Sequence, residues 1–439
     1  MNFHRRSFVA LSLSAPFVFA VRPSFGADRA ALARDVLLTW HRLILELVRH
    51  TATYSPPVAA RTFAYIGVTA HEALVAGNPD LLTLAGQLND LQPVPIPGEG
   101  EHDQAVVLHH ALASVVNALF SNTGPTGQRA MEAMAKKLGE RVAEGIAPDV
   151  VDRSALRGAA VADHILAWAK QDGAAVIDNL GFPRAYTLGS RSQDWAPTSL
   201  VRLQQAPLLP GWGQNRPFAM PSAAVCSLPP HPDYDEAAGS AFYLAAQEVV
   251  EVSRALTAEQ KLIARFWSDD PMLSPTPAGH WISILITIID RNALTVEAAA
   301  AALAKMGVAQ ADAFIACWAT KFDYNLLRPV TYIKRHIDPK WEPLLITPPF
   351  PEYPSGHSTQ SGAASTVLTT IFGDEFAFDD TTHVDDGLPV RSFPSFAAAA
   401  QEAAMSRLYG GIHYRFGNEM GLQQGRCVGA FAAALKTKA

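Results

Sequence analysis

The stretch from Pro348 to His357, Pro-Pro-Phe-Pro-Glu-Tyr-Pro-Ser-Gly-His, constrains this chain more than any other. Its prolines hold the approach extended, because proline fixes φ and has no N–H to donate. Ser355, Gly356 and His357 then open a segment, 358–372, that is predicted to be helical. A hydroxyl, a bare amide and an imidazole at a helix N-terminus favour an oxyanion. The alternative is an ordinary capping turn beside an uninvolved histidine.

Two cations precede this stretch in Lys-Phe-Asp-Tyr-Asn-Leu-Leu-Arg-Pro. Lys321 and Arg328 are seven residues apart, nearly two helical turns, so a helix through both would present them on one face. Pro329 is expected to end that helix. The alternative is a solvated helix face with no partner.

A third motif, Ser-Arg-Leu-Tyr-Gly-Gly-Ile-His, spans residues 406–413. On an unbroken helix Arg407 and His413 would lie on different faces. Gly410 and Gly411 permit a break that brings both side chains to one point. The alternative is a surface cap.

Together the three motifs supply three cations, a hydroxyl, a helix-terminal amide and two histidines. Fixed positive charge suits the equatorial oxygens of a tetrahedral oxyanion that passes to five-coordinate geometry. One apical position then needs a nucleophile or ligand, and the other needs a group that moves a proton.

The pattern Lys-x6-Arg-Pro, Pro-Ser-Gly-His and Ser-Arg-x5-His resembles the signature of vanadium-dependent haloperoxidases, within the type 2 phosphatidic acid phosphatase superfamily. The resemblance implies an all-α fold of two packed helical bundles, of the vanadium chloroperoxidase and acid phosphatase type. It implies vanadate as the cofactor, without haem or flavin. His413 would be the apical metal ligand and His357 the acid–base group. The groups that it implies around the equatorial oxygens are Lys321, Arg328, Ser355, Gly356 and Arg407, with Lys321 also polarising the bound peroxide.

The residues around these motifs favour the haloperoxidase branch. Trp318 and Phe350 match positions that line the halide pocket in chloroperoxidase-like members, although both could simply be core residues. Asp269 matches the acid that pairs with the site arginine, here Arg407. One departure is Gly417, which stands where members often carry an acid four residues after the ligand histidine. How the second ring nitrogen of His413 is held is therefore open.

The resemblance implies oxidation of a halide by hydrogen peroxide to hypohalous acid, which would then react with a small organic acceptor. An acid phosphatase with a phosphohistidine intermediate would use the same residues, because phosphate and vanadate share a shape. A third alternative is an exported oxyanion-binding protein without turnover. The sequence distinguishes poorly among these, and it leaves the choice of halide and a homo-oligomeric state open.

The first 26 residues are predicted to be a secretory signal. Arg5-Arg6-Ser-Phe precedes an apolar run, 9–21, and a small-residue end near Gly26. The paired arginines resemble a twin-arginine signal, and the alternative is an ordinary secretory signal. We therefore expect an exported, periplasmic or secreted protein. The run is too short to predict a stable membrane span.

The mature chain is predicted to have three parts. Helical periodicity predicts a bundle over residues 27–180, and weak periodicity with many Pro, Gly, Ser and Gln residues predicts an irregular connector over 181–235. A second bundle that carries the site is predicted over 236–439, with Asp235 as the cap of its first helix. A long alanine-rich helix is expected from Thr295 to Lys321, and the acidic segment 373–394 is expected to be a solvated loop.

Composition agrees with a large helical core, since 49% of the residues are apolar. Removal of residues 1–26, which hold three arginines and no acidic residue, takes the formal net charge from −6 to −9. That charge argues against nucleic acid and anionic membranes as partners. Cys226, Cys317 and Cys427 do not resemble a disulfide framework, and Cys317 is expected to be buried.

Overall fold

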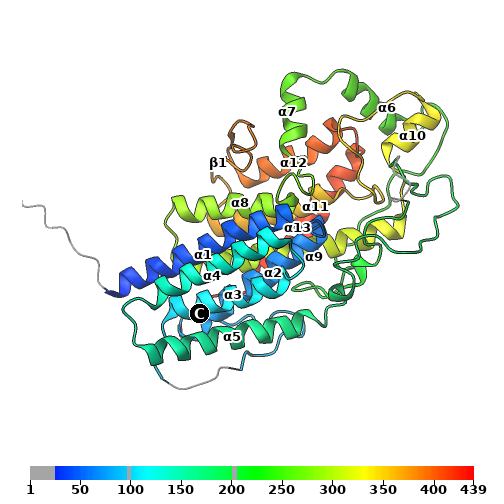
Figure 1. The fold of residues 1–439 in the computed structure, drawn as a ribbon. Coiled ribbons are helices and arrows are strands. Elements are labelled where there is room, and N and C mark those ends of the chain that lie inside the picture. Colours follow the sequence, from blue (N-terminus) through cyan, green and yellow to red (C-terminus); the bar gives the residue numbers. More distant parts are fainter. Residues whose placement is uncertain (1–24, 96–99, 200–204) are drawn as a thin grey trace, which may run out of the picture.

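The structure is a computed structural model that describes residues 25–95, 100–199 and 205–439, and it is almost entirely helical (Figure 1). The predicted signal therefore lies outside the described residues, apart from its last two positions, with which the first helix begins. The elements of the first half are α1 (Phe25–His50), α2 (Pro56–Val75), α3 (Gln104–Leu119), α4 (Pro125–Ala143), α5 (Pro148–Ala169) and the 3-10 turn η1 (Ala174–Val176).

The second half is also helical in the described residues. Its elements are η2 (Trp212–Gln214), α6 (Ala241–Arg254), α7 (Ala258–Phe266), α8 (Thr276–Arg291), α9 (Val296–Tyr324), α10 (Pro329–His336), α11 (Gly356–Phe372), β1 (Phe378–Asp380), β2 (Arg391–Phe393), α12 (Phe396–Tyr409) and α13 (Arg415–Ala433). The all-α prediction is confirmed, and the only strands described are β1 and β2, which form one small antiparallel pair.

Side-chain caps define several helix starts. Thr257 and Gln260 form the reciprocal capping box that begins α7. Thr295 caps α9, which runs past Lys321 as expected. The prediction that Asp235 caps α6 is wrong. Ser240 caps that helix, while the Asp235 carboxylate accepts from the Ala237 amide in the preceding turn.

The two halves of the chain meet where α2 and α9 lie side by side (Figure 1). A Cβ on Gly67 would stand 2.8 Å from the Leu303 carbonyl oxygen, and one on Gly307 would stand 2.6 Å from the Phe63 carbonyl oxygen. Only glycine permits so close an approach of two backbones. One hydrophobic cluster extends from α1 to α13 across this contact. The boundaries proposed near residues 180 and 236 remain a prediction.

A disulfide joins the connector to the last helix. Cys226 and Cys427 are bonded, with their Cα atoms 5.8 Å apart. The interpretation that the cysteines form no disulfide framework is therefore wrong. The two residues are 201 positions apart in the sequence, and only the folded chain shows that they meet. Cys317 is free and buried, as expected.

The segment 373–394 is not the solvated loop that its composition predicts. It contains β1 and β2, which pair in the register Phe378 with Phe393 and Asp380 with Arg391. Asp380 is fully buried, because its carboxylate bonds to a histidine on α8. A buried carboxylate needs such a partner to offset the cost of leaving water.

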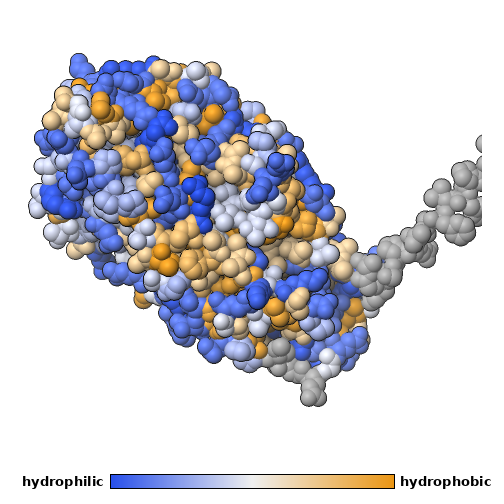
Figure 2. All heavy atoms as spheres, turned by 180° about the vertical axis from the view of Figure 1, so that it is seen from behind, coloured by the Kyte–Doolittle hydropathy of each residue, from blue (hydrophilic) through white to orange (hydrophobic). Residues whose placement is uncertain are grey.

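The outer surface mixes hydrophilic and hydrophobic residues on the face shown in Figure 2. Among the described residues one helix, α9, is apolar and long enough to cross a membrane. Its most apolar window is 89% buried inside the fold, as is usual for the central helix of a bundle. A single such helix is weak evidence for a membrane span.

Candidate functional site

Three buried cations meet at one end of α9, α11 and α12. Lys321 comes from the last turn of α9 and Arg407 from the last turn of α12. The prediction that Lys321 and Arg328 share a helix is wrong. The helix ends at Tyr324, Asn325 turns the chain in the left-handed conformation with φ of 51°, and Arg328 is the N-cap residue of α10. Pro329 begins that helix, a position where its missing N–H has no cost.

Burial strongly perturbs these cations. It lowers the pKa of Lys321 to about 7, that of Arg328 to about 9 and that of Arg407 to about 10. The cause is the loss of water around a charged group, which neighbouring cations aggravate at Arg328. An anion bound among them would stabilise their charged forms and raise these pKa values.

Two aromatic rings lie against the cations. Lys321 Nζ is 5.2 Å from the ring centre of Phe350, and Arg328 Cζ is 4.9 Å from the same centre. The Trp318 ring lies 4.9 Å from Phe350, and its indole N–H donates to the Leu208 carbonyl. The structure thus places both predicted halide-pocket residues beside the cations; their role remains a prediction.

His413 is held in one tautomer. Arg328 Nη1 donates to His413 Nε2 at 2.9 Å, so Nε2 must accept, and His413 Nδ1 donates to Glu352 Oε1 at 2.7 Å. Burial and the nearby charge of Arg328 hold the pKa of His413 well below its usual range. The imidazole is therefore neutral and directs a lone pair at Nε2 into the cationic cluster, as a ligand must.

Glu352 supplies the carboxylate for His413 Nδ1 that Gly417 cannot supply. A Cβ on Gly417 would stand 2.3 Å from Glu352 Oε1, so the glycine leaves room for a carboxylate supplied by another segment. Glu352 also accepts from the Tyr414 amide at 3.0 Å. Sequence reasoning missed this residue, although it stands inside the proline-rich motif. The absence of an acid at Gly417 was the one signal in the sequence that another carboxylate must hold His413.

The N-terminus of α11 carries the hydroxyl, amide and imidazole of the central motif. Ser355 is its N-cap and accepts from the Ser358 amide at 3.4 Å. A Cβ on Gly356 would reach the Trp318 ring at 3.6 Å. His357 Nε2 has no hydrogen-bond partner among the described residues and lies 3.8 Å from Asp269 Oδ2. Burial and the charge of Arg407 hold the pKa of His357 well below its usual range.

The site contains buried N–H donors without a hydrogen-bond partner, as expected of a site that binds an oxyanion. Arg328 Nη2 and Arg407 Nε are buried and have no partner among the described residues. Lys321 Nζ, by contrast, donates to three backbone carbonyls, those of Pro351 and Glu352, each at 2.9 Å, and that of Pro354. Buried donors without acceptors cost free energy, and a tetrahedral anion would supply acceptors to both arginines at once. We call Lys321, Arg328, Ser355, Gly356, Arg407 and His413 the oxyanion cradle.

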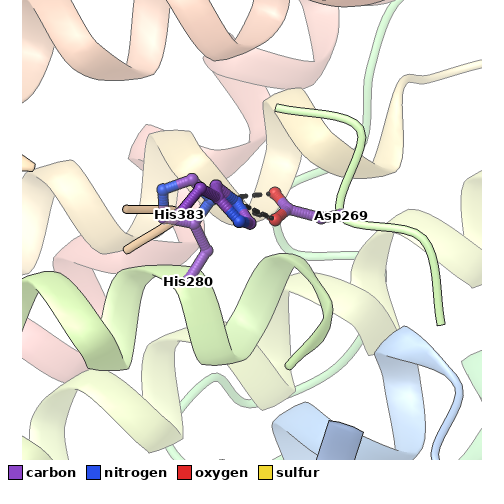
Figure 3. A group of neighbouring side chains, drawn as sticks. All are labelled: Asp269, His280 and His383. Atoms are coloured by element: carbon purple, nitrogen blue, oxygen red, sulfur yellow. Dashed lines mark hydrogen bonds and ion pairs between the residues drawn. The ribbon is translucent and has the colours of Figure 1, made fainter. Parts of the chain in front are cut away.

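Asp269 does not form the predicted pair with Arg407. Its carboxylate oxygens both lie 3.0 Å from His280 Nδ1, and Oδ1 lies 3.2 Å from His383 Nε2 (Figure 3). Arg407 Nη1 instead donates to the Trp267 carbonyl at 2.7 Å. Asp269 still acts on Arg407 through space, together with Asp270.

The two histidines around Asp269 were not predicted as site residues. Burial alone would lower the pKa of His280, but the carboxylates of Asp269 and Asp380 outweigh it and raise the pKa to about 10. The same carboxylate, Asp269, raises the pKa of His383 against the effect of burial. His383 lies in the acidic segment, where composition alone indicated solvent.

Comparisons with known proteins place this site in context. The family model described as the VCPO second helical-bundle domain matches residues 301–439. A segment of 94 residues is 36% identical to a vanadium-dependent bromoperoxidase of Ascophyllum nodosum, and it covers 19% of this chain but only 17% of that relative's length.

Two solved structures cover most of the chain. A crystal structure described as that of the first bacterial vanadium-dependent iodoperoxidase is 39% identical, with a TM-score of 0.85 over 92% of this chain and 97% of the other. An apo bacterial vanadium-dependent chloroperoxidase is 16% identical, with a TM-score of 0.67 over 88% and 94% of the two chains. The second likeness shows the fold, and the first extends to the sequence over nearly the whole length.

Proposed function

The chain belongs to the vanadium-dependent haloperoxidase family, and from this premise we propose that it uses vanadate to oxidise a halide with hydrogen peroxide. One observation carries the proposal: the neutral Nε2 of His413 lies among three buried cations, and two of them, Arg328 and Arg407, each have a buried donor without an acceptor among the described residues. A vanadate ion would supply those acceptors. The 39% identical iodoperoxidase supports iodide as the halide of choice.

The cradle residues divide the work of binding. Lys321, Arg328 and Arg407 offset the negative charge of the oxyanion, and the amides that open α11 add the positive end of a helix dipole. His413 Nε2 supplies the ligand atom, fixed in tautomer by Glu352. When bound, vanadate would supply a Lewis-acidic centre that activates peroxide towards halide without changing its own oxidation state.

His357 is the group that moves protons. Its Nε2 is neutral, because burial and Arg407 depress the pKa, and it has no other partner among the described residues. It can therefore take a proton from hydrogen peroxide. The Asp269 carboxylate, 3.8 Å away, then stabilises the imidazolium that results.

The test compares apo and vanadate-loaded protein side by side. Loaded protein, with vanadium content measured in the same sample, should halogenate a phenol or a diketone when given peroxide and iodide or bromide. Apo protein should not. Lack of halogenation at full vanadium content would refute the proposal. Vanadate-inhibited hydrolysis of a phosphomonoester by the apo protein would instead indicate a phosphatase.

We also propose that the protein is exported, that a twin-arginine signal directs it, and that it acts on a small organic acceptor. The Cys226–Cys427 disulfide supports export, because such bonds persist in oxidising compartments. Fractionation of expressing cells should find the protein outside the cytoplasm. Replacement of Arg5 and Arg6 by lysine should retain it inside, and unchanged export of that variant would exclude the twin-arginine route.

A further inference from the structure

A second group of ligand-type atoms lies behind His357. One oxygen of Asp269, one nitrogen of His280 and one nitrogen of His383 all lie within 4.8 Å of one another, and all three residues are buried (Figure 3). The separations are 3.0 Å and 3.2 Å from the carboxylate to the two imidazoles. Tetrahedral zinc, with bonds of about 2.0–2.1 Å, places its ligand atoms about 3.3 Å apart.

The far nitrogen of each imidazole is held by another carboxylate. His280 Nε2 lies 2.8 Å from Asp380 Oδ2, and His383 Nδ1 lies 3.0 Å from Asp386 Oδ2. Metal-bound histidines have this arrangement, in which an outer carboxylate fixes the tautomer and the orientation of the ring. Both rings thus present a lone pair towards Asp269 when they are neutral.

Packing fixes the two rings. The Trp267 ring stacks on His280 with centres 4.4 Å apart and an interplanar angle of 17°, and Phe266 meets His383 edge to face at 5.3 Å. The ligands come from three separate segments: the loop after α7, the helix α8, and the turn between β1 and β2. A rigid, dry surrounding is what a bound ion requires of its outer shell.

The charges of the group also match a divalent ion. Three carboxylates surround the two imidazoles, and Arg49 pairs with one of them, Asp386. Two negative charges remain when both imidazoles are neutral. A divalent ion would neutralise them, and so would protons on both rings, which is the alternative that the measurements below separate from a bound ion.

We propose that Asp269, His280 and His383 bind a divalent transition-metal ion, with zinc as the best match to two imidazoles and one carboxylate. This site is separate from the oxyanion cradle and does not depend on the proposed halide oxidation. Its metal would also fix Asp269, whose second oxygen faces His357. The cradle and the acid–base histidine would then be braced by an ion that takes no part in the oxidation.

The decisive measurement is elemental analysis of the full chain purified without added vanadate. Wild-type protein dialysed against metal-free buffer should retain about one zinc per chain, determined together with vanadium by mass spectrometry. His383→Ala should lose it. His50→Ala is the matched control, because His50 is an exposed imidazole beside a carboxylate, Glu46, and should retain the metal.

Two further measurements keep the test decisive if His383→Ala does not fold. Metal-stripped wild type should gain thermal stability on addition of Zn²⁺, and Co²⁺ should give the visible absorption of a tetrahedral site. Asp380→Asn should weaken Zn²⁺ binding by about 10–100-fold, measured by chelator competition. Wild type that retains no metal and does not respond to Zn²⁺ would overturn the site in favour of protonated imidazoles. Undiminished metal in a folded His383→Ala would overturn the ligand assignment.

Discussion

At the residue scale, His413 and Glu352 show that the acid partner of a histidine can come from a distant part of the sequence. The carboxylate that holds His413 comes from Glu352, 61 positions away, and not from the turn that follows the histidine. The same hydrogen bond results, because the bond requires only an acceptor at Nδ1. Positions 352 and 417 therefore depend on each other, because the Glu352 carboxylate occupies the space that a side chain at Gly417 would fill.

Glu352→Gln should weaken vanadate binding by about 10–100-fold, because the amide accepts more weakly from His413 Nδ1 and so fixes the tautomer of the imidazole less firmly. Vanadate titration of halogenating activity measures the change. Glu342→Gln is the control, since Glu342 is 71% exposed and pairs with Lys334 on the surface. Equal vanadate affinity in the two variants would show that Glu352 does not position the ligand.

Gly417→Ala should displace Glu352 and destabilise the fold by about 1–3 kcal/mol through overpacking. Gly211→Ala is the matched control, because a Cβ there meets nothing within 4 Å. Gly417→Asp combined with Glu352→Ala should recover part of the lost vanadate affinity, since the new carboxylate would occupy the vacated space. Urea unfolding and vanadate titration of each variant check both effects.

The motif residues could be named from sequence because their spacing resembles a family signature, and the structure brings Lys321, Arg328, Arg407 and His413 together. Their assigned roles remain predictions. Glu352, His280 and His383 could not be identified, because their partners lie in distant segments and no local pattern specifies which acid meets which imidazole. Asp269 was named correctly as a nearby acid but with the wrong partner, since burial beside two histidines decides its bonds.

At the element scale, the alanine-rich helix that begins after Thr295 and the helix that follows Ser355 were predicted, and the turns around them were not. The spacing of Lys321 and Arg328 is compatible with one helix, yet Asn325 adopts the left-handed conformation and ends it. Asp235 and Ser240 are both good capping residues. Only the fold shows that the first closes a turn and the second begins α6.

The disulfide joins the irregular connector to α13, so its removal should destabilise the fold. Cys226→Ser with Cys427→Ser should lower the free energy of unfolding by about 2–4 kcal/mol, because a long loop in the unfolded chain is released. Urea unfolding measures the loss. A reducing agent should produce a similar shift in wild type and none in the double variant. A reductant-sensitive double variant would contradict this explanation.

At the scale of the whole molecule, buried histidines in the first half make stability depend on pH. Burial lowers the pKa of His41 and of His109 to about 4, so both stay neutral in the fold while the unfolded chain takes up protons below about pH 6.5. Stability should therefore fall as the pH drops from about 6.5 to about 4, by up to about 3 kcal/mol for each histidine.

Urea unfolding between pH 4 and pH 7 tests this dependence. His41→Gln should flatten the slope by about the share of one histidine, because the amide does not titrate. An equal slope in wild type and His41→Gln would show that His41 is not a source of the acid sensitivity.

The close crossing of α2 and α9 has a consequence for synthesis on the ribosome. Every residue of α2 from Pro57 to Leu74 is buried in the folded protein. At Gly67 and Gly307 the backbones of α2 and α9 are too close for any side chain larger than that of glycine. The helix is translated long before its partner. Until α9 emerges, the apolar face of α2 that it covers has no native partner, which favours non-native contacts in the nascent chain.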